Sequence, residues 1–149
     1  MVIRVLLADD HPMLRRGMRA LLEKAGDIEV VGEAADGREA LELVEELPAD
    51  VLLLDVEMPE MDGMQVAREI NKNEIPVRIL ALSAYDDNQY VLGMLACGAA
   101  GYLTKDEAPG LVVTAIRRVA AGEEGWLSRR VYDRISSSTD DSDLAKQPL

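Results

Sequence analysis

The chain has 149 residues, enough for about one domain, and 48% of them are apolar, which allows a sizeable core. Its formal net charge is −12, and so acidic a chain is by itself a poor binder of DNA or anionic membranes. The single cysteine, Cys97, excludes an internal disulfide and favours a reducing compartment. The sequence also shows no signal peptide and no apolar run that could span a bilayer. We therefore expect a cytoplasmic protein that does not bind membranes.

Short runs rich in Val, Ile and Leu recur along the chain without clean polar alternation. This pattern is typical of parallel strands that are buried on both faces. The predicted strands are Val2–Ala8, Ile28–Ala34, Val51–Leu54, Val77–Leu82 and Gly101–Leu103.

Amphipathic segments lie between these runs and after the last one. The expected helices run from Pro12 to Gly26, from Asp36 to Pro48, onward from Gly63, from Asp86 to Gly98, and from Ala108 to Ala121. Five strands alternating with five helices predict an α/β fold, a (βα)₅ doubly wound parallel sheet. The flavodoxin-like strand order 2-1-3-4-5 is the expected topology.

The pattern weakens after Gly122. Trp126 and Leu127 are expected to pack onto the body, and Ser128 to cap one short helix that carries Val131 and Ile135. Residues 136–149 are polar and of low complexity, which predicts a flexible linker. The expected organisation is therefore one domain over residues 1–135 and a linker over 136–149.

Polar side chains follow four of the predicted strands. Because the carboxyl ends of parallel strands share one edge of the sheet, we expect these groups to converge. They are Asp9 and Asp10 after the first strand, Asp55 after the third, Ser83 after the fourth and Lys105 after the fifth.

The chemistry of this set is coherent. Three close carboxylates repel one another unless a cation joins them, and Mg²⁺ prefers oxygen ligands of this kind. Lys105 adds a positive charge that can reach a phosphate oxygen, and Ser83 adds a hydroxyl donor. A carboxylate can act as a nucleophile toward phosphorus, and Asp55 is the central candidate.

Each residue also has a structural interpretation. Asp9 and Asp10 taken alone are most often a turn or a helix cap, and Lys105 alone is most often a surface lysine. His11 has no second histidine or nearby cysteine, so it is expected to begin a helix rather than to bind zinc. The joint placement after four strands of one sheet favours a functional site.

Four stretches of the sequence resemble the receiver domain of two-component response regulators. They are residues 7–11 (Leu-Ala-Asp-Asp-His), residues 52–63 around Asp55, residues 81–84 (Ala-Leu-Ser-Ala) and residues 98–105, which end in Thr104-Lys105. The resemblance covers about residues 2–135 and includes all five strands. It implies a protein that switches on phosphorylation rather than an enzyme that turns over an external substrate.

The resemblance also implies roles for individual residues. Asp55 would accept phosphate from a partner histidine kinase. Asp9, Asp10, Asp55 and the backbone carbonyl of Glu57 would hold Mg²⁺, and Ser83 and Lys105 would grip the phosphoryl group. Tyr102 would be an aromatic switch that follows Ser83 and alters the face made by the fourth helix, fifth strand and fifth helix. On sequence alone, Tyr102 is equally well explained as a tyrosine at the sheet edge.

The subclass that the sequence resembles is the NarL/LuxR type of transcription factor. The stretches Asp10-His11-Pro12, residues 28–34 and residues 98–106 are typical of it, and so is a linker ending in Pro148-Leu149. A helix-turn-helix domain that binds DNA is then expected beyond these 149 residues, so DNA would be contacted only through that domain. The chain departs from the common pattern in having Ser83 in place of threonine and no phenylalanine.

Two other functions stay open from the residues. A Mg²⁺-dependent phosphohydrolase that forms an aspartyl phosphate would use similar groups, although such enzymes usually carry a second Asp where this chain has Glu57. The second open function is that of an interaction domain whose fold is receiver-like but whose site is not used. A homodimer on phosphorylation is expected either through the first and fifth helices or through the fourth helix, fifth strand and fifth helix.

Overall fold

The predicted apolar runs form five strands of one parallel sheet. A computed structural model describes residues 1–146, with side chains described through Ser137. The strands are β1 (Ile3–Ala8), β2 (Ile28–Ala34), β3 (Val51–Asp55), β4 (Arg78–Ser83), β5 (Gly101–Thr104) and a short β6 (Trp126–Leu127). The order is β2-β1-β3-β4-β5-β6, and every pairing is parallel. The predicted order 2-1-3-4-5 is confirmed, and β6 extends it at one edge.

The expected helices are present and begin at recognisable signals. Their bounds are α1 (Pro12–Lys24), α2 (Gly37–Glu46), α3 (Gly63–Lys72), α4 (Asn88–Ala96), α5 (Ala108–Ala120) and α6 (Arg129–Lys146). Pro12 stands in the first turn of α1, where a missing backbone N–H costs nothing. Asp36 caps α2, and Asp62 forms a capping box with Gln65 at the start of α3.

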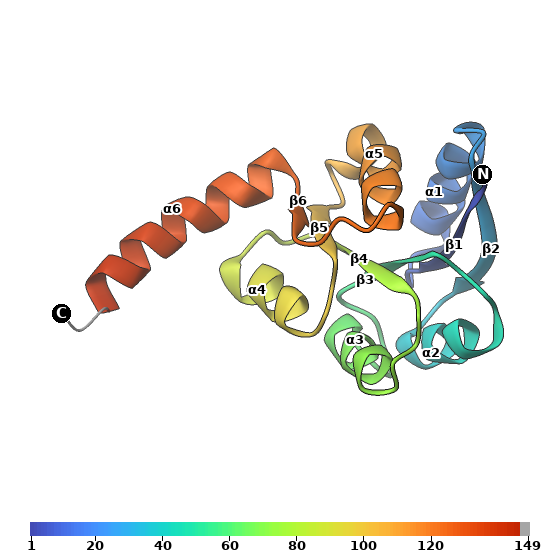
Figure 1. The fold of residues 1–149 in the computed structure, drawn as a ribbon, viewed down its shortest axis with the longest axis horizontal. Coiled ribbons are helices and arrows are strands. Elements are labelled where there is room, and N and C mark those ends of the chain that lie inside the picture. Colours follow the sequence, from blue (N-terminus) through green and yellow to red (C-terminus); the bar gives the residue numbers. More distant parts are fainter. Residues whose placement is uncertain (147–149) are drawn as a thin grey trace.

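The sheet separates two layers of hydrophobic core, because successive side chains of a strand point to opposite faces. On β3, Leu52 and Leu54 pack with α2, α3 and α4, whereas Val51 and Leu53 pack with α1 and α5. Figure 1 shows α1 and α5 on one face of the sheet and α2, α3 and α4 on the other. A strand that is buried on both sides must be apolar throughout, which explains the absence of alternation in the sequence.

The end of the chain differs from the prediction. Trp126 and Leu127 pair with β5 as β6, rather than only packing on the body. The helix that Ser128 begins does not stop after Ile135 but continues to Lys146, so it is longer than the short helix expected from the sequence. No glycine or proline lies between Arg129 and Lys146 to break the helix. Pro148 and Leu149, which the linker interpretation included, lie outside the described residues.

Figure 1 shows α6 leaving the body after its first turns. The first turns contribute to the core: Val131 is fully buried and Ile135 packs beside the α2–α4 layer. Within residues 1–146, no helix combines the length and the apolar composition that crossing a membrane requires.

Candidate functional site

The register of the sheet brings the predicted polar residues to one edge. Asp55 lies opposite Leu82, the residue before Ser83, and Ser83 lies opposite Thr104, the residue before Lys105. Ala8 pairs with Leu54, so Asp9 and Asp55 emerge beside each other where β1 and β3 end. The edge lies at the carboxyl ends of the strands, where ligands of open α/β sheets bind.

Asp55 is the most deeply buried of the three carboxylates, with only 1% of its surface exposed. Its Oδ1 accepts a hydrogen bond from the Glu57 backbone N–H at 3.1 Å, and its Oδ2 lies 2.9 Å from Lys105 Nζ. Burial raises the pKa of Asp55 to about 6, although the Lys105 ammonium opposes this shift. Near neutral pH the carboxylate is therefore ionised but poorly solvated, as a nucleophile needs to be.

Lys105 joins two of the carboxylates. Its Nζ lies 2.9 Å from Asp55 Oδ2 and 3.3 Å from Asp9 Oδ2. Burial by itself lowers the pKa of the Lys105 ammonium, but the ion pair with Asp55 outweighs it and the net pKa is raised. Lys105 therefore places a permanent positive charge beside Asp55, the carboxylate to which a negatively charged group would be added.

Asp9, Asp10, His11 and Asp55 form a cluster suited to a cation. One potential ligand atom from each lies within 4.8 Å of all the others. Asp9 Oδ2 and Asp10 Oδ1 are buried and accept no hydrogen bond among the described residues, although Lys105 Nζ lies 3.3 Å from Asp9 Oδ2 and His11 Nδ1 lies 3.1 Å from Asp10 Oδ1. Buried carboxylate oxygens without donors need a charge partner. The oxygen donors fit a hard divalent ion such as Mg²⁺, for which Asp9, Asp10 and Asp55 are the ligands at hand.

His11 stands at the rim of this cluster. Its backbone N–H donates to Asp9 Oδ1 at 2.8 Å, and its Nδ1 lies 3.1 Å from Asp9 Oδ1 and from Asp10 Oδ1. As predicted, it is the residue before α1, and it makes no side-chain cap there. No feature of the sequence indicated that its ring would contact both carboxylates.

Arg15 contacts the backbone of Asp9, and Glu33 contacts Arg15. Neither residue was predicted from the sequence to belong to the site. Arg15 Nη1 donates to the backbone carbonyl of Asp9, and Arg15 Nε donates to Glu33 Oε1 at 2.9 Å. Arg19 also contacts Glu33. Burial alone would raise the pKa of Glu33, but the two arginines outweigh it and the net pKa is lowered. The one feature of the sequence that could have indicated the contact with Asp9 is that Arg15 is a basic residue in the first turn of the helix that follows Asp9.

Ser83 and Tyr102 lie in the interior beside the site. Ser83 is fully buried, and its Oγ accepts the Tyr85 backbone N–H at 3.0 Å. Tyr102 is also fully buried, and its hydroxyl donates to the Tyr85 carbonyl at 2.5 Å. Burial raises the pKa of Tyr102 to about 12, so it stays protonated. The ring is therefore packed inside and not at the open sheet edge.

The loop after Asp55 folds tightly over the phosphoacceptor candidate. Gly63, the first residue of α3, donates its N–H to the Val56 carbonyl at 2.8 Å. A Cβ on Gly63 would stand 2.7 Å from the Asp55 carbonyl oxygen and 2.7 Å from Val56 Cα. Glu57 is exposed, and its backbone N–H donates to Asp55. The start of α3 therefore fixes the backbone around Asp55.

Comparison with known proteins places the chain among signalling proteins. The sequence profile of the response regulator receiver domain matches residues 5–117. The nitrate/nitrite response regulator protein NarL of Escherichia coli is 42% identical over 119 residues, which are 80% of this chain and 55% of NarL. The transcriptional regulatory protein LiaR of Bacillus subtilis is 39% identical over 140 residues, 92% of this chain and 66% of LiaR.

Solved structures give the same result. A LuxR-family two-component response regulator from Aurantimonas superposes with a TM-score of 0.88 at 32% identity, covering 94% of this chain and 99% of that one. The chain spans only a little more than half the length of the NarL proteins it matches, 55 to 56%. The resemblance seen in the sequence motifs is confirmed at the level of the receiver domain.

Proposed function

Because the chain belongs to the response regulator receiver family, with NarL/LuxR-type regulators among its relatives, we propose that Asp55 accepts a phosphoryl group from a histidine kinase. The observation that carries this proposal is the buried Asp55 carboxylate, 2.9 Å from the Lys105 ammonium that also contacts Asp9. The site thus presents a nucleophile beside a fixed positive charge. Family membership favours this signalling role over the phosphohydrolase alternative.

The proposed step is a direct transfer. An Asp55 carboxylate oxygen attacks the phosphorus of a phosphohistidine, and a P–O bond forms. The P–N bond breaks, its electron pair stays on the imidazole, and the imidazole takes up a proton. Lys105 neutralises charge on the transferred group, and the Ser83 hydroxyl donates to one of its oxygens. Such transfers depend mainly on positioning and charge neutralisation.

Mg²⁺ is part of the proposal. Asp9, Asp10, Asp55 and the Glu57 backbone carbonyl would hold it, and it would supply positive charge to the phosphoryl oxygens. Asp9 and Asp55 are almost fully buried and Asp10 is about two-thirds buried. A shallow hollow of about 410 Å³ opens beside the site, lined by His11, Met13, Leu14, Ala84 and Lys105. We propose that a donor histidine approaches the carboxylates through this hollow.

The remaining proposals concern the rest of the regulator. Phosphorylation would let Ser83 and Tyr102 shift the face made by α4, β5 and α5, and residues 136–149 would lead to a DNA-binding output domain. A homodimer would form through α1 and α5 or through the α4–β5–α5 face. The single cysteine is consistent with a cytoplasmic protein.

Intact mass measured after incubation with acetyl phosphate and Mg²⁺ tests the central step. We expect wild type to gain the mass of one phosphoryl group and Asp55→Asn to gain none. A gain in both would move the phosphoacceptor elsewhere. No gain in either, with Mg²⁺ binding established, would favour the interaction-domain alternative with an idle site.

A further inference from the structure

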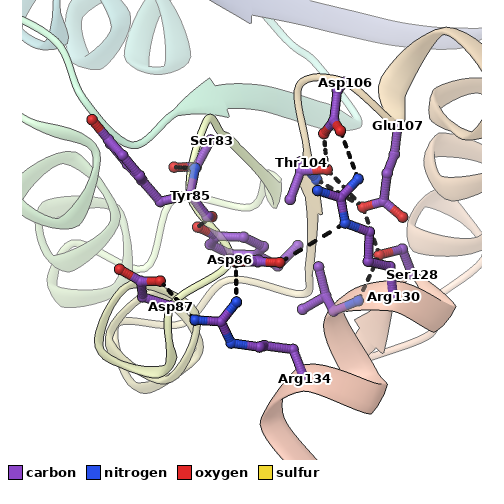
Figure 2. Close-up of polar contacts among 12 residues, drawn as sticks. Ser83, Tyr85, Asp86, Asp87, Thr104, Asp106, Glu107, Ser128, Arg130 and Arg134 are labelled. Carbon is purple, nitrogen blue, oxygen red and sulfur yellow. Dashed lines mark hydrogen bonds and ion pairs between the residues drawn. The ribbon is translucent and has the colours of Figure 1, made fainter.

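Two arginines near the start of α6 contact both loops that flank the site. Arg134 reaches Asp86 at 3.1 Å and Asp87 at 3.2 Å, in the loop between β4 and α4. Arg130 reaches Asp106 at 2.6 Å, in the loop between β5 and α5, and Asp86 at 3.9 Å. Figure 2 shows these side chains converging from α6 on the two loops.

The two loops carry the residues that would act on a phosphoryl group. Ser83 is three residues before Asp86, and Lys105 directly precedes Asp106. The backbone between Ser83 and Asp86 is held at Tyr85, whose N–H donates to Ser83 Oγ and whose carbonyl accepts from Tyr102. A continuous series of hydrogen bonds and ion pairs thus joins the interior of the site to α6.

The beginning of α6 is itself firmly attached. Ser128 Oγ accepts the Val131 N–H at 3.2 Å, which caps the helix, and donates to Glu107 Oε1 at 2.8 Å. Thr104 donates to the same Glu107 oxygen, also at 2.8 Å. Val131 is fully buried in the core layer of α4. If either loop shifts, the start of α6 cannot move with it, because that movement would break the contacts of Ser128 and Val131.

We propose that Arg130 and Arg134 are positioning residues that hold the loops of Ser83 and Lys105 in their resting arrangement, so that phosphorylation at Asp55 and attachment of α6 oppose each other. This inference rests on the proposed function. This coupling requires that Ser83, in donating its hydroxyl to a group on Asp55, draws the residues that follow it away from α6. Ser83 Oγ is the acceptor in its bond with the Tyr85 N–H, so its own O–H is available to donate. Because coupling between two sites is reciprocal, removing the arginines tightens the site for a phosphoryl group.

Affinity for beryllofluoride in the presence of Mg²⁺, measured on the 149-residue chain, tests the proposal. We expect the double variant Arg130→Ala, Arg134→Ala to bind about three- to tenfold more tightly than wild type, since several half-exposed ion pairs are each weak. Lysines at both positions keep the charge and should return the affinity most of the way to wild type. Arg129→Ala is the matched control: Arg129 is 92% exposed and pairs with Asp133 inside α6.

The outcomes separate the two proposals. If wild type fails to bind beryllofluoride, the proposed function fails. If wild type binds and the double variant equals the Arg129→Ala control or binds more weakly, the role of the arginines is overturned and the proposed function stands.

Hydrogen exchange on wild type gives a second readout that does not depend on a variant folding. We expect the amides of residues 129–136 to exchange faster when beryllofluoride is bound. Unchanged or slower exchange there would contradict release of α6.

Discussion

At the scale of single residues, the site concentrates charge where water is scarce. Asp55 and Asp9 are almost fully buried, and Lys105 is the cation that contacts both. A buried carboxylate is costly in its ionised form unless partners compensate it. Burial raises the pKa of Asp55 although Lys105 opposes the shift, so we expect the ionised site to destabilise the fold until a cation binds.

Asp55→Asn should therefore stabilise the protein in the absence of divalent cations. Because the pKa of Asp55 is about 6 in the folded chain and near 3.8 in the unfolded chain, the folded chain holds an extra proton between these values. The free energy of unfolding then falls as pH rises from about 4 to 6. We expect Asn to raise it by about 1–3 kcal/mol at pH 7.5, the upper figure being the full pKa difference.

Urea unfolding in a chelator at pH 7.5 and pH 4 measures this effect. The gain should vanish at pH 4, where Asp55 is protonated in the folded chain. Asp133→Asn changes an exposed carboxylate on α6 and should stay within about 0.5 kcal/mol of wild type. A loss of stability in Asp55→Asn at pH 7.5 would show that the ion pair with Lys105 outweighs burial.

Arg15→Ala should weaken both the fold and the metal cluster. The change removes the donor to the Asp9 carbonyl and one partner of Glu33. Charge-assisted hydrogen bonds at partly buried positions are worth about 1–3 kcal/mol, and we expect a loss in this range with a weaker affinity for Mg²⁺. Calorimetric Mg²⁺ titration and urea unfolding check the two effects. Arg16→Ala, at the exposed neighbour, should change neither.

At the scale of the elements, helix starts determine the shape of the loops at the site. α3 begins one short loop after Asp55, and its first residue, Gly63, touches the backbone of Asp55 and Val56. The capping box of Asp62 and Gln65 holds this end of the helix. The position of the phosphoacceptor thus depends on a glycine that belongs to a different element.

Gly63→Ala should destabilise the chain and disturb the site. Its Cβ would stand 2.7 Å from the Asp55 carbonyl oxygen, so backbone must move, at a cost of about 1–3 kcal/mol. Gly17→Ala in α1 is the control, because nothing lies within 4 Å of its Cβ, and it should stabilise by up to about 1 kcal/mol. Thermal unfolding of both variants checks the opposite signs. Equal changes in the thermal stability of the two variants would mean that the backbone around Asp55 adjusts to a Cβ at residue 63 without cost.

At the scale of the whole molecule, a single sheet separates two core layers and carries the site at the carboxyl ends of its strands. β1, β3 and β4 contribute side chains to both layers, and β1 and β3 end at the proposed metal cluster. A ligand that binds only the folded chain therefore stabilises the whole domain. The net charge of −12 adds to the attraction for cations over the molecule as a whole.

Mg²⁺ should raise the free energy of unfolding by mass action. At a free concentration one hundred times the Kd the gain is about 2.7 kcal/mol, and a chelator should remove it. Asp10→Asn should lose most of the gain, because it removes one proposed ligand. Urea unfolding with Mg²⁺, or with NaCl at equal ionic strength, separates site binding from screening of the net charge. A full gain from NaCl would argue against a specific site.

The sequence by itself determined five of the six strands, the order of the elements and the identity of the polar residues at the strand ends. Apolar runs that form strands buried on both faces are recognisable without any partner, because every position must be apolar. Once parallel strands are inferred, Asp9, Asp55, Ser83 and Lys105 must emerge at one edge. Local signals such as Pro12, Asp36 and Ser128 likewise indicated where helices begin.

Only the tertiary structure decided which side chains meet. The contacts of Arg15 with Glu33 and of Arg134 with Asp86 join residues 18 and 48 positions apart, and an exposed arginine carries no local sign of its partner. The pairing of β6 was also missed, since two residues are too few for a strand pattern. The extent of α6 was not predicted either. The raised pKa of Asp55 arises from burial, a property of the folded chain and not of the residue.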